Sequence, residues 1–436
     1  MTPTAGPNEP HARLLRWLLW GIAAVGFAVP LIFYGLIFGT VDTLTPPQAI
    51  ETLLRDRESA VLVDVRPAAE FRTRHIDGAE NWPLAEIITA ADSGDVPERL
   101  AGKKLLLICD GGVNSTRAAR HLDDLGVERA AAVRGGIEEW IGTAGEAEPG
   151  PFQRFRTASG RTVGFPFRET PAAEQFALVV SGFVVKPIYT LISLVLVVIL
   201  WRSQSADLAA LRYAMLCFFV GENCCAANFL IYAETSYLLE YLHMYGMLLC
   251  FGFTTYAVLE GIDLRILRLS DPEGKCAALG LCRPCVKYAD APCGLKRTFL
   301  LIVPACIVLA CMPLSADWQA FSYNTSIYGT PYHFAHLWYQ RVLETHYCSI
   351  AAIVLLTASL LILCFKRDNP LPPAKLAFAA AMGPLGFGFF RLLLATAYSR
   401  DLLWSNFWEE STELLFVVGV GIVLWIFRQG LFVKQQ

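Results

Sequence analysis

Long apolar segments dominate the hydrophobic pattern of this chain. Eight of them are long enough to cross a bilayer core of about 30 Å, which takes about 20 residues in a helix. They lie near residues 14–39, 178–202, 207–232, 240–262, 297–314, 345–365, 374–397 and 409–428. The first is too long for the apolar core of a signal peptide and no small-x-small cleavage site follows it convincingly, so it is predicted to be a retained anchor. The pattern therefore predicts a membrane protein with eight transmembrane helices.

The region between the first two apolar segments contains a candidate nucleophile. Residues 105–119 read LLLICDGGVNSTRAA, which predicts an apolar strand that ends at Cys109, a turn with glycines, and a helix that begins at Ser115. This order points backbone N–H groups and a helix N-terminus at the sulfur. We therefore expect a lowered pKa for the Cys109 thiol and a loop that holds an anionic sulfur.

Further motifs flank this loop in order. AVLVDVRPAAEF contains an Asp-x-Arg, RHIDGAENWPL follows it, and VRGGIEEW closes the region with a Gly-Gly pair ahead of a helix. With these motifs, residues 45–148 resemble a rhodanese-like domain. The resemblance implies a doubly wound α/β domain of parallel strands. With the apolar segments, it predicts a mixed architecture in which this domain is joined to an all-α transmembrane bundle. It also implies that Cys109 carries a persulfide between a sulfur donor and an acceptor.

One position departs from the family's pattern. The family often has arginine at the fifth position after the cysteine, where this chain has Asn114, and Arg117 is the candidate to supply that charge. The candidate catalytic residues are Cys109, Asp110, Gly111, Gly112, Asn114, Ser115 and Arg117.

Composition and charge agree with a membrane protein. The chain of 436 residues is 55% hydrophobic and 17% charged, with a net charge of −3, and the absence of a Lys/Arg run argues against a nucleic-acid partner. Lys and Arg concentrate in alternate short loops. By the positive-inside rule, both termini are predicted in the cytoplasm and the 45–148 domain in the periplasm of a bacterial inner-membrane protein. Residues 149–173 are predicted to be a linker, and residues 174–436 a seven-helix module.

One predicted cytoplasmic loop, residues 271–297, is rich in cysteine. It contains Cys276, Cys282, Cys285 and Cys293, with a CxxC pair among them. Four thiolates in a short loop suit zinc or an iron–sulfur cluster, and the reducing cytosol disfavours disulfides. The redox context favours the cluster. The alternative is an unliganded surface loop.

Histidine and glutamate side chains gather at the predicted outer face. Glu240 and His243 form an ExxH pair, as in di-iron helical bundles, and His243 with His346 could instead be axial ligands to haem b. The candidate metal ligands here are His243, His336, His346, Glu240 and Glu413. The alternative is the polar and aromatic belt that membrane proteins have at their interfaces.

Three charged residues are predicted to lie within the hydrocarbon region, away from the ends of their spans: Lys186, Glu222 and Arg391. An intramembrane charge costs about 2.5 kcal/mol or more on insertion scales, so such residues normally face a partner or a cavity. We expect Glu222 to pair with Arg391 or Lys186. The pair would be a structural salt bridge or part of a proton or substrate path.

Together these features predict a membrane-bound, sulfur-handling redox protein. Cys109 would take sulfur from a small sulfur compound or a persulfide donor, and the membrane module would move electrons between the outer centre and the four-cysteine centre. Membrane lipid and an electron-transfer partner or quinone are the expected partners. Two alternatives are a transporter of sulfur species with structural zinc, and a periplasmic ligand sensor or assembly factor.

Overall fold

The computed structural model describes residues 21, 24–32, 34–36, 41–127, 129–143, 150–232, 236–267, 294–315, 322–335, 342–366, 370–398 and 401–432. The chain folds as two compact units. An α/β unit comprises Met1–Glu169 together with Ala320–Tyr339, and a helical unit comprises Thr170–Gln319 together with Gln340–Gln436.

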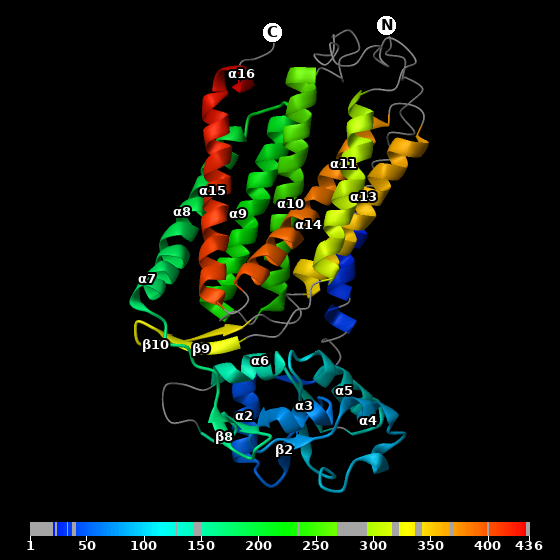
Figure 1. Cartoon of the computed structure of the whole chain (residues 1–436), viewed down its shortest axis with the longest axis vertical. Coiled ribbons are helices and arrows are strands. Elements are labelled where there is room, and N and C mark those ends of the chain that lie inside the picture. Colours follow the sequence, from blue (N-terminus) through cyan, green and yellow to red (C-terminus); the bar gives the residue numbers. More distant parts are fainter. Residues whose placement is uncertain are drawn as a thin grey trace. The chain divides into compact units, whose positions relative to one another are not determined.

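The α/β unit is built on a five-stranded parallel sheet with the strand order β1-β6-β5-β2-β4 (Figure 1). Its strands are β1 (Thr43–Leu44), β2 (Ala60–Asp64), β4 (Glu80–Asn81), β5 (Lys104–Ile108) and β6 (Ala130–Val133). β2 and β5 are apolar throughout most of their length, as strands buried on both faces are.

Successive side chains of these strands point to two separate cores, as the period of two requires. One core joins Leu62 and Leu106 to helices α2 (Pro46–Arg55) and α6 (Gly136–Trp140). The other joins Val63 and Leu107 to α4 (Leu84–Thr89) and α5 (Val113–Asp124). Helices therefore cover both faces of the sheet, and the prediction of a parallel α/β domain is confirmed.

Two smaller sheets complete this unit. Part of the segment predicted to be a linker forms β7 (Arg154–Thr157) and β8 (Thr162–Gly164), and β7 pairs with β3 (Arg74–Ile76) beside α3 (Ala68–Thr73). The second sheet is a hairpin of β9 (Ser322–Ile327) and β10 (Thr330–Ala335). This hairpin comes from between two helices of the other unit, yet it belongs to the α/β unit.

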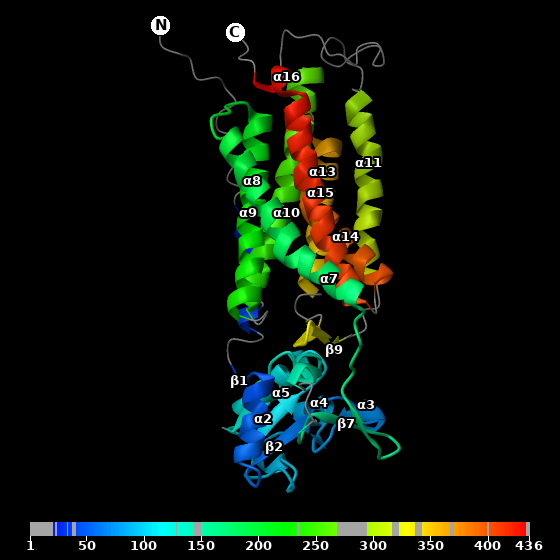
Figure 2. The same cartoon turned by 90° about the vertical axis from the view of Figure 1, so that its left-hand side faces the viewer.

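The helical unit contains long apolar helices that run side by side (Figures 1 and 2). They are α7 (Ala172–Val180), α8 (Lys186–Leu200), α9 (Ala206–Tyr232), α10 (Tyr237–Gly261), α11 (Gly294–Cys311), α13 (Cys348–Phe365), α14 (Leu371–Ala397) and α15 (Leu402–Ile426), followed by the short α16 (Arg428–Phe432). In the described part of the chain, six helical spans are long and apolar enough to cross a membrane: Ala172–Leu200, Ala206–Tyr232, Tyr237–Arg265, Lys296–Ser315, Val342–Phe365 and Leu371–Leu394.

The total of eight transmembrane helices stays a prediction. Residues 24–32 and 34–36 are helical, within the predicted anchor. α15 covers the eighth predicted segment, but Glu409, Glu410 and Glu413 interrupt its apolar sequence. With these three carboxylates in its first half, α15 is not among the six candidate spans.

Chain order agrees with the placement of the hairpin in the α/β unit. Four of the six candidate spans lie between residue 169 and the hairpin. An even number of crossings returns the chain to the same side of a membrane. Four crossings would therefore leave the α/β domain and the hairpin on one side, in agreement with their shared unit.

Glycines allow close packing where the polar residues of the helical unit lie. A Cβ at Gly246 of α10 would lie 2.8 Å from the Gly221 Cα of α9, so the two backbones touch at this crossing. Gly221 directly precedes Glu222, and His243 lies one turn before Gly246 on α10. Just before Lys186, residues Ser181–Val185 form a π-helical turn, a distortion often found at functional sites.

Candidate active site at Cys109

The Cys109 sulfur lies in the loop between β5 and α5. Its Sγ accepts hydrogen bonds from the backbone N–H groups of Gly112 at 3.2 Å and Ser115 at 3.4 Å. The Ser115 hydroxyl lies 3.6 Å from the sulfur and donates to the Gly112 carbonyl. Gly112 has φ +87°, which favours glycine, and this turn directs the N–H groups inward. The loop therefore surrounds the sulfur with donors, as the sequence predicts.

The Gly-Gly pair ahead of α6 supports the loop from the other side. The N–H groups of Ile137 and Glu138 donate to the carbonyls of Cys109 at 2.8 Å and Asp110 at 3.1 Å. Gly136 has φ +61°, and a Cβ there would come inside 3.0 Å of both carbonyl oxygens. Only glycine allows α6 to approach the loop this closely.

Arg66 connects the loop to the end of β2. Its Nη2 lies 2.6 Å from the buried Asp64 carboxylate, and its Nη1 lies 3.1 Å from the Asp110 carboxylate. The Asn81 side chain donates to the carbonyls of Asp64 and Arg66, which holds this corner in place. The Asp-x-Arg motif contains both Asp64 and Arg66, but the sequence alone did not identify them as site residues.

The predicted lowering of the Cys109 pKa is wrong. The side chain is only 3% exposed, and this burial raises the pKa of the thiol. Hydrogen bonds from Ser115 and Gly112 oppose the rise, while the negative charge of Asp110 adds to it. The sequence predicts the N–H donors correctly, but it does not show how far burial removes water from the sulfur and so raises the pKa of the thiol.

The other predicted loop residues differ in exposure. Gly112 and Ser115 are buried, Gly111 is half-buried, and Asp110 is exposed beside Arg66. Asn114 and Arg117 lie in the first turns of α5 with exposed side chains. The charged contact that the structure shows at this loop is the Arg66–Asp110 pair.

A second missed residue is Glu139 on α6. Burial raises the pKa of its carboxyl to about 7, partly opposed by the positive charge of Arg134. The carboxyl lies over Gly135, and Gly135 in turn lies against Gly112. Its place in the VRGGIEEW motif was the only signal in the sequence.

Comparison with known proteins agrees with this geometry. The family model described as a rhodanese-like domain matches residues 47–143. Thiosulfate sulfurtransferase GlpE of Pseudomonas putida (strain GB-1) is 37% identical over 103 residues, which cover 23% of this chain and 84% of that protein. The chain belongs to the rhodanese family.

A longer relative of the rhodanese domain is a plant protein. Adenylyltransferase and sulfurtransferase MOCS3-2 of Zea mays is 33% identical over 90 residues, which cover 20% of this chain and 19% of that protein. Both relatives are named sulfurtransferases, and both matches are confined to the α/β unit. They therefore bear on the rhodanese domain and leave the helical unit without a counterpart in these matches.

The charged residues predicted inside the spans form two groups. Lys186 Nζ lies 2.8 Å from the Glu222 carboxylate and 2.9 Å from the Glu410 carboxylate. Arg391 does not contact Glu222; it pairs with Glu409 and, at 3.1 Å, with Glu344. Of the two partners that the sequence suggested for Glu222, the structure brings Lys186 into contact.

The predicted outer-face ligands have separate surroundings. His243 is 3% exposed and lies 3.4 Å from Glu222, whereas His346 Nδ1 lies 3.0 Å from the hydroxyl of its neighbour Thr345. Glu240 accepts a hydrogen bond from Asn228 at 3.3 Å. Haem b or di-iron binding by these residues stays a prediction.

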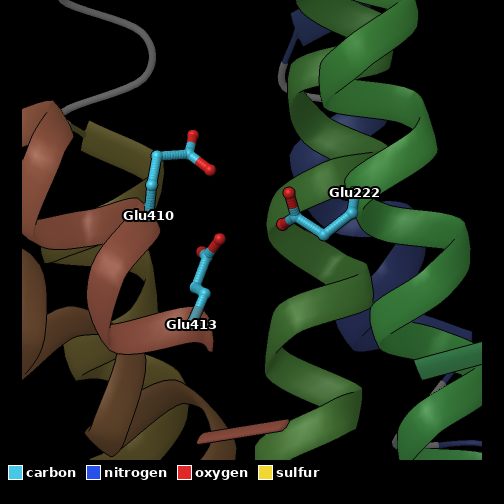
Figure 3. A group of neighbouring side chains, drawn as sticks. All are labelled: Glu222, Glu410 and Glu413. Atoms are coloured by element: carbon cyan, nitrogen blue, oxygen red, sulfur yellow. The ribbon is translucent and has the colours of Figure 1, made fainter. Parts of the chain in front are cut away.

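Within the described ranges, the one set of three possible metal-ligand groups is Glu222, Glu410 and Glu413 (Figure 3). The three carboxylates point toward one another, Glu222 from α9 and the other two from α15. Glu413 thus lies with Glu222 and Glu410, and of the predicted histidine ligands His243 lies 3.4 Å from Glu222. His336 and all four cysteines of the 271–297 loop lie outside the described residues.

Proposed function

We propose that this chain is a membrane-bound sulfurtransferase in which Cys109 carries sulfane sulfur as a persulfide. The observation that carries the proposal is the pair of backbone N–H groups, from Gly112 and Ser115, that donate to the cysteine sulfur. A persulfide adds a second sulfur about 2 Å beyond the first. Inward-facing N–H groups at the start of α5 suit the negative charge of that outer sulfur.

The reaction balances without a cofactor when thiosulfate is the donor. The Cys109 thiol loses its proton, and the resulting thiolate attacks the outer sulfur of thiosulfate. A new S–S bond forms as the bond within thiosulfate breaks, and sulfite leaves with the electron pair. A nucleophilic acceptor then takes the outer sulfur, and Cys109 is released as a thiolate. Since burial raises the pKa of the thiol, loss of its proton is part of the barrier.

The proposed setting is the outer face of a bacterial inner membrane. The distribution of Lys and Arg supports a periplasmic rhodanese domain with both termini in the cytoplasm. We further propose that the helical unit couples sulfur release to electron transfer, with a metal centre at the four-cysteine loop and a quinone or protein as electron partner. Transfer of the outer sulfur to a nucleophilic acceptor needs no added electrons, but its release as sulfide takes two electrons and two protons, and this second route supports the coupling.

The test is persulfide formation on the full-length protein in detergent. After incubation with thiosulfate, peptide mass spectrometry should find one added sulfur atom on Cys109, with release of one sulfite. Cys109→Ser should lose both signals. Cys217→Ser, which changes a cysteine of the helical unit, is the matched control and should keep them. Equal sulfur uptake by Cys109→Ser would contradict the proposal and favour a binding role for the domain.

A further inference from the structure

A cluster of polar side chains lies inside the helical unit, away from Cys109. Glu222 of α9 and Glu410 and Glu413 of α15 each place an oxygen within 4.8 Å of the others. Tyr189 and Lys186 of α8 contact two of these carboxylates. At 1.5 Å per residue, Glu222 is about 15 Å from the nearer end of its helix, so the cluster lies well within a membrane span.

The contacts of Tyr189 require a proton on a carboxyl group. Its hydroxyl lies 2.7 Å from Glu222 Oε2 and makes a second short contact with Glu410 Oε2. The hydroxyl has one proton and can donate it to only one of these oxygens. The contact to which the tyrosine does not donate also needs a proton between its two oxygens, because they lie at hydrogen-bond distance. That second proton must come from the carboxyl group in that contact, which is Glu222 or Glu410.

Glu413 adds a carboxyl for which the cluster shows no matching charge. It is 7% exposed, it points at the other two glutamates, and its Oε2 is a buried oxygen without a hydrogen-bond partner in the described part of the chain. Lys186 already contacts Glu222 and Glu410. A buried carboxylate with neither a donor nor a cation is strongly disfavoured in apolar surroundings. The charge of the Glu413 carboxylate can therefore be neutralised by a proton or by an added cation.

Charged and titratable groups approach Glu413 from several helices. They are Glu409 and Glu410 on its own helix, Lys186 and Tyr189 on α8, Glu222 on α9 and Cys250 on α10. Arg391 of α14 is held by Glu409 and Glu344. Three glutamates thus share one lysine, and His243 is in contact with Glu222.

Lys186 decides between a proton and a metal ion. Its ammonium group lies at hydrogen-bond distance from two of the three carboxylates that a metal ion would need as ligands. A divalent ion would repel this ammonium group at a distance of a few ångströms in a medium of low dielectric constant. A proton on Glu413 leaves the lysine contacts intact.

A cavity lies near this cluster. It has a volume of about 1660 Å³, and its lining includes Asp207, Arg265, Thr254 and Phe416. Phe416 is three residues after Glu413, so the two lie on one face of α15. The cavity therefore reaches to within one helical turn of Glu413.

We propose that Glu222, Glu410 and Glu413 form an intramembrane proton-binding site, in which Glu413 gains and loses the proton. Lys186 and Tyr189 keep the other two carboxyl groups in place during the exchange. The site gives the helical unit a proton-linked function that does not depend on sulfur chemistry at Cys109.

Infrared spectroscopy of the full-length protein in lipid nanodiscs tests this site. Protonated carboxyl groups absorb apart from carboxylates, and exchangeable ones shift in heavy water. We expect a carboxylic-acid band at neutral pH that shifts in heavy water and disappears at high pH. Glu413→Gln should lose the pH-dependent part of that band. Glu409→Gln is the matched control, because Glu409 is on the same helix as Glu413 but forms an ion pair with Arg391, and it should leave the band unchanged.

Folding and metal binding are checked on the same samples. Glu413→Gln should elute as wild type does on size exclusion, and Glu413→Asp should restore a pH-dependent band. The absence of a carboxylic-acid band at neutral pH would overturn the proposal, as would an unchanged band in Glu413→Gln. A stoichiometric metal ion in the purified wild type that Glu413→Gln lacks would also overturn it, in favour of a metal site.

Discussion

Replacement of Gly136 by alanine should damage the cysteine loop more than its small size suggests. At φ +61° a non-glycine residue costs about 1–2 kcal/mol. The new Cβ would also displace the carbonyls of Cys109 and Asp110, which accept from Ile137 and Glu138. Loss of these two hydrogen bonds adds about 1–3 kcal/mol at 0.5–1.5 kcal/mol each. We expect a total of about 2–5 kcal/mol of local destabilisation.

Gly102→Ala is the matched control for this prediction. Gly102 also has a positive φ, +71°, but a Cβ there would meet no atom within 4 Å. Gly102→Ala should therefore lose only the stability that a non-glycine residue costs at a positive φ. Hydrogen exchange of peptides from residues 104–124 measures the local stability, and persulfide formation on Cys109 measures the consequence for the site. Equal losses in the two variants would refute the idea that α6 supports the loop through Gly136.

Three further predictions concern pH, topology and metal. Burial raises the pKa of the Glu139 carboxyl to about 7 from an ordinary 4.5, so ionisation of this group weakens the folded state as pH rises through this window. Glu139→Gln should therefore raise the opening free energy of residues 130–140 by up to about 3 kcal/mol at pH 8, and leave it unchanged at pH 4. Hydrogen exchange of these residues measures that free energy. A cysteine at the exposed Asp95 should react with a membrane-impermeant thiol reagent on intact spheroplasts while Cys282 does not; the reverse pattern would contradict the periplasmic placement. Elemental analysis should find one metal centre that is lost when any of Cys276, Cys282, Cys285 or Cys293 is replaced; unchanged metal in Cys285→Ala would favour an unliganded loop.

Features that depend on local sequence could be predicted. The strand before Cys109 and the glycine turn after it follow from residues that are neighbours in the chain, and the structure has them in that order. Asp64 and Arg66 were visible in a motif, but the contact of Arg66 with Asp110 depends on β2 and β5 lying side by side in the sheet. The prediction of a lowered pKa for Cys109 was wrong because this pKa depends on burial, which is a property of the whole domain.

The polar cluster in the helical unit also depends on contacts between helices, which the sequence does not show. Glu222 and Lys186 could be identified because charges are rare in apolar helices. Tyr189 and Glu410 were missed, since a tyrosine in a span and a glutamate near a helix end are both ordinary. Glu413 was assigned to the histidine ligands because its depth was estimated from sequence, whereas its partners depend on the rotation of α15 about its axis.

The hairpin β9–β10 bears on why the rhodanese domain is joined to this membrane module. Asn324 donates to the Ile141 carbonyl at 2.7 Å, and His333 Nε2 lies 2.9 Å from the Glu138 carbonyl. These carbonyls are at the C-terminal end of α6, where a helix leaves its last acceptors without partners. The opposite end of α6 holds the Cys109 loop. The chain therefore uses a segment from between two membrane-spanning candidates to complete the helix that supports its sulfur site. Such an arrangement makes the folding of the site depend on the helical unit's own chain, which a domain joined only by a flexible tether would not require.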